Sequence, residues 1–316
     1  LYEAKRQGGG QVVSYSSSIR GDADHRLGMD RRLREAFESE RLFLHYQPVI
    51  EQATRRVLGV EALLRWEDGE NGRVPPSEFV PIAEEMGFMV PLGTWVLEQA
   101  CRQLKVWRGA GLPPFRMAVN VSRRQLERDD LASVVERVLS ESGLDAGLLE
   151  LEISEGRALH GDPGIVARLR SLKAFGVRIV VDDFGTGPSS IASLRRFPID
   201  TLKIDRSLIA GAEDGEDEAA VVSATVAAAR RLGLGVVAVG VETRGQLACA
   251  AELGCDAFQG FHFSQPLPPA EFAAALRIDE RAVPRWETTG ADDVAVVSSS
   301  TRTRRNTGKV GGSSDV

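Results

Sequence analysis

The sequence has few of the residues that build disulfide frameworks or histidine-ligated metal sites. Its 316 residues include three cysteines and four histidines. Cys101, Cys249 and Cys255 are scattered without C-x-x-C spacing, and no two histidines stand at ligand spacing. A His-built zinc site is therefore disfavoured. We expect the cysteines to be buried free thiols in a reducing compartment.

The sequence also lacks long apolar runs and an excess of positive charge. No run reaches the roughly 20 residues of a membrane span, and there is no signal peptide. The formal net charge of −6 disfavours a nucleic-acid polymer as partner, but not a small anionic ligand held by metal. We expect a cytoplasmic domain. Because the chain starts at Leu1 rather than Met, we expect a piece of a longer protein, which leaves membrane tethering elsewhere open.

Alternating strand and helix patterns extend from Leu42 to Arg277. The predicted strands are Phe43–Ile50, Val57–Trp66, Phe115–Val121, Leu148–Ser154, Val177–Asp183, Thr201–Asp205, Gly235–Val241 and Ala257–Phe263. The clearest predicted helices are Gly93–Arg108, Ile165–Phe175, Glu218–Leu232, Thr243–Leu253 and Pro269–Leu276. Eight strands over about 235 residues match an α/β fold, the (β/α)₈ TIM-like barrel, with a typical length of about 250 residues.

The first two predicted strands are joined only by Glu51–Arg56, too short for a crossover helix. The first strand is therefore expected to be antiparallel to the second. A doubly wound open sheet is the alternative fold, but nothing resembles its G-x-G-x-x-G fingerprint.

Two adjacent carboxylates, Asp182 and Asp183, follow a run of β-branched residues and precede a glycine-rich loop. Adjacent acids repel each other unless a cation neutralises them, and hard cations such as Mg²⁺ prefer oxygen ligands. The alternative is a solvated acidic turn, because Asp and Gly are both turn residues.

Other predicted strand ends repeat this polar pattern. The barrel places its active site at the carboxyl ends of the strands. The residues found there are Glu61, Arg65, Asn120, Glu152, Glu155, Asp182, Asp183, Lys203, Asp205 and Gln259. Several carboxylates on one rim repel strongly unless neutralised. Their oxygens suit one or two Mg²⁺ or Mn²⁺ ions, a known device for phosphodiester hydrolysis. Lys203 could orient the attacking water or neutralise developing charge.

A series of short motifs occurs along the chain: Tyr46-Gln47-Pro48, Glu61-Ala62-Leu63-Leu64-Arg65-Trp66, Asn120-Val121-Ser122, Glu152-Ile153-Ser154-Glu155, Asp182-Asp183-Phe184-Gly185-Thr186-Gly187, Leu202-Lys203-Ile204-Asp205 and Gln259-Gly260-Phe261. These motifs resemble those of EAL domains, bacterial phosphodiesterases that linearise cyclic di-GMP to pGpG. They occur in the family's order from about Leu33 to Arg277.

The resemblance implies a role for each motif residue. Glu61, Asn120, Glu152 and Asp182 would hold a first Mg²⁺ or Mn²⁺ ion, and Asp182 and Asp183 would serve a second. Lys203 would contact the nucleophilic water. The residues lining the cyclic di-GMP site would be Gln47, Leu64, Arg65, Asp205 and Gln259. Glu155 would brace the loop Asp183–Ser190, which couples the family's active site to a dimer interface, so a homodimer is expected.

The segment Leu1–Val13 resembles the C-terminal end of a GGDEF (diguanylate cyclase) domain. The alternative is a frayed terminal helix. We therefore expect residues 1–15 to be a GGDEF remnant, residues 16–29 a linker, residues 30–281 the EAL barrel, and residues 282–316 a disordered tail. Upstream GGDEF and sensor domains would be partners in the full-length chain.

One position departs from the family in a way that bears on catalysis. The family's strand-seven motif Ala-Glu-Gly-Val-Glu reads Ala238-Val239-Gly240-Val241-Glu242 here. Val239 replaces the proposed general base, and Glu242, three residues later, is expected on the other face of the strand. Losing one positioned base typically costs ~10²–10⁴ in rate. Pro188 is a second departure, which stiffens the coupling loop.

Two functions therefore remain open from the sequence. One is a phosphodiesterase slowed by Val239. The other is a receptor module that binds cyclic di-GMP without hydrolysing it. A purely structural barrel is disfavoured by the acidic rim.

Overall fold

A computed structural model describes residues 17–69, 72–128, 130–155, 163–186 and 194–279, all of which belong to the unit Leu1–Trp286. The expected GGDEF remnant at 1–15, the tail at 282–316 and Pro188 lie outside the described residues.

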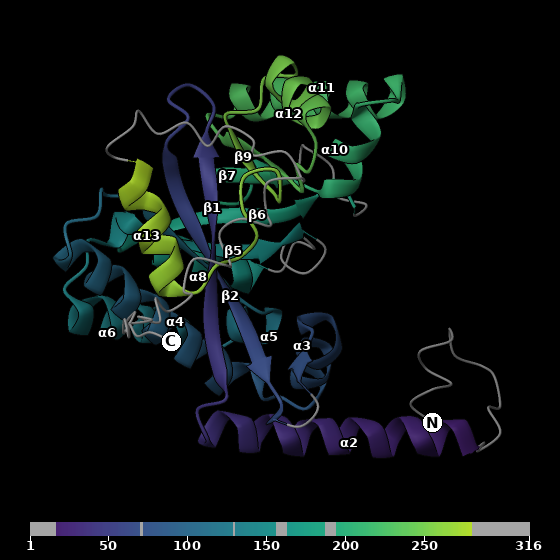
Figure 1. The fold of residues 1–316 in the computed structure, drawn as a ribbon, viewed down its shortest axis with the longest axis vertical. Helices are drawn as coiled ribbons and strands as arrows, with labels where there is room; N and C mark the ends of the chain where they lie inside the picture. Colours follow the sequence, from purple (N-terminus) through teal and green to yellow (C-terminus); the bar gives the residue numbers. More distant parts are fainter. Residues whose placement is uncertain (1–16, 70–71, 129, 156–162, 187–193, 280–316) are drawn as a thin grey trace, which may run out of the picture. The chain divides into compact units, whose positions relative to one another are not determined.

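The described strands form one sheet that closes into a barrel (Figure 1). The strands are β1 (Leu42–Glu51), β2 (Val57–Glu67), β3 (Arg73–Val74), β4 (Arg116–Asn120), β5 (Leu149–Ser154), β6 (Arg178–Phe184), β7 (Thr201–Ile204), β8 (Gly235–Val239) and β9 (Ala257–Gln259). Their order is β1-β9-β8-β7-β6-β5-β4-β2-β3, and pairing between β1 and β2 closes the ring. β1 is antiparallel to both β2 and β9, whereas β2 and β4 to β9 pair in parallel. The predicted barrel with an antiparallel first strand is confirmed.

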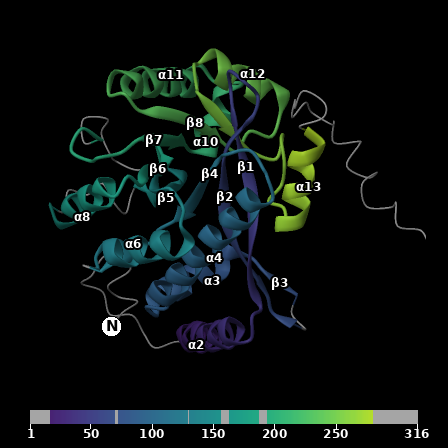
Figure 2. The same ribbon diagram turned by 90° about the vertical axis from the view of Figure 1, so that its left-hand side faces the viewer.

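Helices lie around the outside of the sheet (Figure 2). They are α2 (Ser17–Glu38), α3 (Pro76–Glu85), α4 (Met89–Gly109), α5 (Arg123–Leu126), α6 (Leu131–Ser142), the 3₁₀ helix η2 (Ala146–Leu148), α8 (Pro163–Ala174), α10 (Arg206–Ala212), α11 (Glu216–Arg231), α12 (Arg244–Glu252) and α13 (Pro269–Asp279). Capping boxes at Ser122 and Thr243 begin α5 and α12 by satisfying backbone N–H groups that have no helical partner.

Alternation along each strand separates the main core from the barrel interior. On β7 and β8, Leu202 and Val236 join the large apolar core that packs against the helices. Their neighbours Lys203 and Val237 must face the other way, because successive strand side chains point to opposite faces. Val237 lies in a small separate apolar cluster with Val49 and Ala257. The carboxyl-end motif residues therefore project into one interior.

The structure differs from the expected linker at residues 16–29, because residues 17–38 form the single helix α2. Polar residues and two glycines predicted a break there. Farther along the helix, Met29, Leu33 and Ala36 are buried in a cluster with Trp66 and Phe79. Burial of these side chains stabilises the helix more than its composition disfavours it.

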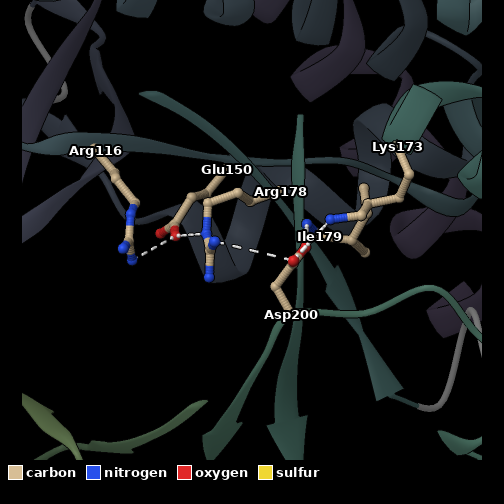
Figure 3. A network of polar contacts seen from close by, with 6 residues as sticks. All are labelled: Arg116, Glu150, Lys173, Arg178, Ile179 and Asp200. Atoms are coloured by element: carbon tan, nitrogen blue, oxygen red, sulfur yellow. Dashed lines mark hydrogen bonds and ion pairs between the residues drawn. The ribbon is translucent and has the colours of Figure 1, made fainter. Parts of the chain in front are cut away.

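The amino-terminal end of the barrel carries a chain of alternating charges (Figure 3). Arg116 and Arg178 both donate to Glu150 Oε1, at 3.2 and 3.1 Å. Asp200 accepts from Lys173 Nζ at 2.7 Å and from the backbone N–H of Ile179 at 2.7 Å. The contacts link β4, β5 and β6 with Asp200, the residue before β7, and with Lys173 of α8. Positive and negative charges alternate along this chain and compensate each other.

Replacing Asp200 tests how much this chain of charges stabilises the fold. Asp200→Ala leaves Lys173 without its carboxylate and the Ile179 N–H without its acceptor. We expect the free energy of unfolding to fall by about 1–3 kcal/mol in urea titrations. The control is Glu127→Ala, which removes an exposed helical ion pair with Arg123 and should change stability by less than about 0.5 kcal/mol. Equal effects of the two variants would contradict this role.

Candidate active site

The polar residues predicted at the strand ends meet inside the carboxyl-terminal end of the barrel. Each lies one residue from a strand residue in the outer core, and so on the inner face. The inward residues are Gln47 on β1, Glu61 on β2, Asn120 on β4, Glu152 on β5, Asp182 on β6, Lys203 on β7, Val239 on β8 and Gln259 on β9. Parallel strands end at the same edge, which explains why residues far apart in sequence converge.

Lys203 lies at the centre of this group and is only 2% exposed. Its Nζ donates to Glu152 Oε1 at 2.7 Å and to Glu61 Oε2 at 2.8 Å. Asp182 Oδ1 lies 4.0 Å from the same nitrogen. One ammonium group therefore compensates carboxylates from three different strands.

Two amides orient Glu61 further. Asn120 Nδ2 donates to Glu61 Oε1 at 2.8 Å, and Gln259 Nε2 donates to Glu61 Oε2 at 2.7 Å. Gln259 Nε2 also lies 3.3 Å from Gln47 Oε1, and Gln47 Nε2 donates to the carbonyl of Ser264. Both Glu61 oxygens thus accept hydrogen bonds, which fixes the carboxylate before any ligand binds.

The buried charges shift each other's pKa values in opposite directions. Burial alone would raise the pKa of Glu61, but Lys203 and the amide donors outweigh it and lower the pKa to about 2. Burial and the negative charge of Glu61 raise the pKa of Glu152 well above its usual range. Burial also raises the pKa of Asp182, to about 6. The pKa of Lys203 is raised despite burial, because the three carboxylates favour its charged form.

The pKa values of Glu61 and Glu152 shift in opposite directions because the two carboxylates accept different hydrogen bonds. Both accept from Lys203, but Glu61 also accepts from two amides, whereas Glu152 Oε2 is buried with no hydrogen-bond partner among the described residues. A buried carboxylate oxygen without a donor is costly in its charged form. This oxygen is therefore available to a cation.

The donor chemistry of this group fits a hard cation. Carboxylate and amide oxygens are the ligands that Mg²⁺ and Mn²⁺ prefer. Within the described part of the chain, no set of three or more His, Cys, Asp or Glu side chains is already spaced to hold a metal ion. Glu61 Oε2 and Glu152 Oε1 accept hydrogen bonds from the Lys203 ammonium, and Glu61 Oε1 accepts from Asn120. A cation would compete with these donors for every oxygen of the two glutamates except Glu152 Oε2.

Asp183 lies near the end of β6, and Glu155 directly follows the last residue of β5. Asp183 is exposed and has a φ of 56°, a left-handed conformation that non-glycine residues rarely adopt. Glu155 is fully buried, and its Oε2 accepts a hydrogen bond from the Gly185 N–H at 2.8 Å. Gly185 has a φ of 102°, and a Cβ there would clash with Leu208 Cδ1. The hydrogen bond attaches Glu155 to the backbone of Gly185, the first residue after β6. The predicted bracing role of Glu155 requires such a contact.

Val239 is the last residue of β8, and its neighbour in the register is Gln259. It faces the barrel interior, packed with Val49 and Val237, and is partly buried. Glu242 comes after the turn at Gly240, which has a φ of 74°, and is exposed. The expected general-base position therefore holds an apolar side chain, and Glu242 lies in the connection between β8 and α12.

Asp205 has a role that the sequence did not predict. Its Oδ1 accepts from the backbone N–H and the hydroxyl of Ser207 at the start of α10. These contacts make Asp205 the N-cap of that helix.

Arg65 and Leu64 line a cleft of about 340 Å³ beside the acidic group. Asn120 and Asp183 line the same cleft, so two predicted metal ligands border the space where two predicted ligand-binding residues lie. Its other wall comes from α3 and α4 and was not predicted. The residues there are Pro76, Val80, Glu84, Met89, Gly93 and Val96. Two prolines obscured the helical pattern of α3, so no sequence signal brought these residues to the site.

Comparisons with known proteins agree with this geometry. Residues 30–266 match the EAL domain model. The chain is 40% identical over 276 residues to the bifunctional diguanylate cyclase/cyclic di-GMP phosphodiesterase MucR of Pseudomonas aeruginosa, covering 87% of this chain and 40% of MucR. It is 39% identical over 282 residues to the cyclic di-GMP phosphodiesterase NbdA of the same organism, covering 88% of this chain and 36% of NbdA.

A solved structure, the PaMucR phosphodiesterase in its c-di-GMP complex, superposes with a TM-score of 0.75 and 41% identity, covering 78% of this chain and 99% of that one. The chain thus spans 40% or less of the length of the two full-length relatives. The family match, the barrel and the converging motif residues agree: the chain belongs to the EAL domain family.

Proposed function

We propose that this chain is a cyclic di-GMP signalling domain that hydrolyses cyclic di-GMP to pGpG with Mg²⁺ or Mn²⁺, at a rate impaired by Val239. The observation that carries the proposal is the convergence of Glu61, Glu152, Asp182 and Lys203 beside the cleft that contains Arg65. The similarity to two relatives named as cyclic di-GMP phosphodiesterases supports the choice of ligand.

The first metal ion would be held by Glu61, Asn120, Glu152 and Asp182, and Asp183 with Asp182 would hold a second. Such ions supply charge stabilisation to a phosphodiester undergoing attack. Asn120 would act through its amide oxygen, and the buried Glu152 Oε2, which has no hydrogen-bond partner among the described residues, is ready to accept a cation.

The chain's own groups would position the substrate and the water. Arg65 is half-buried beside the cleft and would contact a phosphate, with Leu64 packing against the ligand. Gln47 and Gln259 would contact the sugar or base edges. Lys203 would hold the attacking water, since an ammonium group donates up to three hydrogen bonds. Val239 cannot accept a proton, so the step that needs a general base is slow.

The alternative function is a receptor module that binds cyclic di-GMP without turnover. The inward-facing Val239 favours it, because a valine at the base position removes proton transfer without disturbing the other motif residues. The two functions share the ligand and differ in the rate of hydrolysis.

We also propose a domain context, a localisation and an oligomeric state for this chain. MucR is named as a bifunctional diguanylate cyclase and phosphodiesterase, which supports a GGDEF domain in a longer chain. Upstream sensor domains are part of the same proposal. We further propose a cytoplasmic homodimer in which the Glu155-braced loop links site and interface. Among the described helices, none combines the length and the apolar character needed to cross a membrane.

The proposed metal site can be tested without an activity assay. Calorimetric titration of the purified chain with Mg²⁺ or Mn²⁺ should show binding that Glu61→Gln and Asp182→Asn each weaken by at least ~10-fold, because each removes an anionic ligand. Glu127→Gln, an exposed carboxylate on α5's C-terminal side, is the control and should bind like the unmodified chain. Unchanged affinity in both site variants would exclude the site.

The role of Val239 can be tested by restoring the carboxylate. Val239→Glu should raise hydrolysis of cyclic di-GMP to pGpG by at least ~10², the lower range for one general base, and should change ligand affinity much less. Chromatographic detection of pGpG with Mg²⁺ or Mn²⁺ measures the rate.

Two controls sharpen this test. Val239→Gln introduces a polar side chain of about the same size as glutamate. Because glutamine cannot act as a base, this variant should not raise the rate. Glu242→Gln removes the exposed neighbouring carboxylate and should leave the rate unchanged. Fast hydrolysis by the unmodified chain, with no gain from Val239→Glu, would show that Val239 is no handicap. If the unmodified chain bound no cyclic di-GMP at all, the proposed function would be wrong.

A further inference from the structure

A second groove, of about 460 Å³, runs along β1, and no described residue lines both this groove and the cleft. One wall is β1 from Leu42 to Tyr46, and Pro268 and Pro269 also border the space. The other wall is one face of α4, because the residues there recur at helical spacing. They are Trp95, Gln99, Arg102, Gln103 and Val106.

The backbone hydrogen bonds of β1 alternate between its two edges. The Arg41 carbonyl accepts from the N–H of the last residue of β2 at 3.1 Å, so odd-numbered residues bond toward β2. Tyr46 bonds to Leu267 instead, donating at 2.8 Å and accepting at 2.9 Å. Residues two apart in an antiparallel strand point their N–H and C=O groups the same way. Leu42 and Leu44 therefore direct theirs away from β2, toward the groove.

The chain leaves this edge of β1 open beyond Leu267. The next residues are Pro268 and Pro269, which have no N–H to extend the pairing, and Pro269 begins α13 beside β1 (Figure 1). Within the described residues, the edge-facing N–H and C=O groups of Leu42 and Leu44 have no hydrogen-bond partner. Such an edge can pair with an added strand.

Side chains of an added strand would meet the apolar part of α4. Leu44 is buried in the same core cluster as Leu97 and Cys101 of α4, so this face of β1 points toward that helix. A residue directly opposite Leu44 in an antiparallel pair places its side chain on the same face. Of the groove-lining residues of α4, Trp95 is partly buried and Val106 is 57% exposed, so both have apolar surface left to cover.

The groove also has a charge preference. Arg102 is the only Lys, Arg, Asp or Glu among its described lining residues. Its Nη1 donates to Gln99 Oε1 at 3.2 Å, and no carboxylate in the described part of the chain pairs with it. A carboxylate on the occupant would compensate this charge, whereas a lysine or arginine would be repelled.

We propose that this groove binds an extended segment of a partner protein as an added antiparallel strand on β1, the direction in which Leu267 already pairs. The segment has apolar side chains at two alternate positions and a carboxylate at the next position of the same alternation. Backbone bonds to Leu42 and Leu44 supply affinity, and the α4 face with Arg102 supplies specificity. Binding here needs neither metal nor cyclic di-GMP.

Fluorescence anisotropy of labelled synthetic peptides with the purified chain tests the added strand. The hexapeptide Thr-Val-Thr-Val-Thr-Glu carries its valines and glutamate on one face, and the reversed sequence puts the glutamate at the other end. At least one of the two should bind at up to ~1 mM. N-methylation of both valines should weaken binding at least ~10-fold, because it removes the two donors that face β1. N-methylation of two threonines, whose N–H groups face away, should change it by less than ~3-fold.

The role of Arg102 is tested by reversing its charge. Arg102→Glu should weaken binding of the glutamate peptide by about 5-fold, and it should favour the same peptide with lysine in place of glutamate. The matched control is Arg108→Glu, an exposed residue of the same helix that is not among the described lining residues. This variant should keep the preference for glutamate. Both positions are exposed, so both variants should fold, which circular dichroism checks.

The outcomes that would overturn the proposal are distinct. Absence of binding by both peptides at ~1 mM would exclude a peptide groove. Equal losses on N-methylation of the valines and of the threonines would show that the peptide does not pair with β1. Equal effects of Arg102→Glu and Arg108→Glu would exclude recognition of the carboxylate by Arg102. If light scattering showed that the peptide dissociates a dimer of the chain, the occupant would be a second copy and not a separate partner.

Discussion

The site depends on one interaction, the contact of the buried Lys203 ammonium with Glu61 and Glu152. Each of these groups would be costly to bury alone, and breaking such a pair typically costs about 3–5 kcal/mol. The lysine is on β7, and the two glutamates are on β2 and β5, so the contact joins strands that do not pair with one another. The amides of Asn120 and Gln259 extend it to β4 and β9. The same group of side chains thus organises the barrel interior and the candidate active site.

The two ends of the barrel differ in the balance of their positive and negative side chains. At the amino-terminal end, Arg116, Glu150, Arg178, Asp200 and Lys173 alternate in sign and compensate one another. At the carboxyl-terminal end, Lys203 faces three carboxylates, with Asp183 beside them, so negative charge is in excess. The first arrangement stabilises the fold without needing a ligand. The second has capacity for a cation, which is why we place the chemistry there. The cleft next to this acidic group is lined by Arg65 and by apolar side chains of α3 and α4.

The strands and the converging residues could be predicted because their signals are local. Each barrel strand is a short apolar run, and the polar residue at its end stands out. The sequence predicts the second half of α2, where Leu33 and Phe37 stand four residues apart, but not its first half, whose polar residues and glycines predicted a linker. It does not predict α3 either, because prolines obscure the pattern of this helix and its stability comes from packing of Phe79 against distant residues. Asp205 resembles a site residue in sequence, but whether a carboxylate caps a helix or faces a ligand depends on the next turn of the chain. The cleft wall containing Glu84 was missed for the same reason: no motif marks a residue whose position is set by another helix.

The central claim is that Lys203 and Glu61 stabilise each other inside the barrel, and a double-mutant cycle on unfolding tests it most directly. Urea titrations with chelator present would compare Lys203→Met, Glu61→Gln and the double variant with the unmodified chain. Each single variant leaves a buried group with less compensation and should be strongly destabilised. The double variant should be more stable than the sum of the two effects predicts, by at least ~1.5 kcal/mol, since interacting residues couple by about 0.5–3 kcal/mol. Additive effects, within about 0.5 kcal/mol, would contradict the claim that this contact holds the site together.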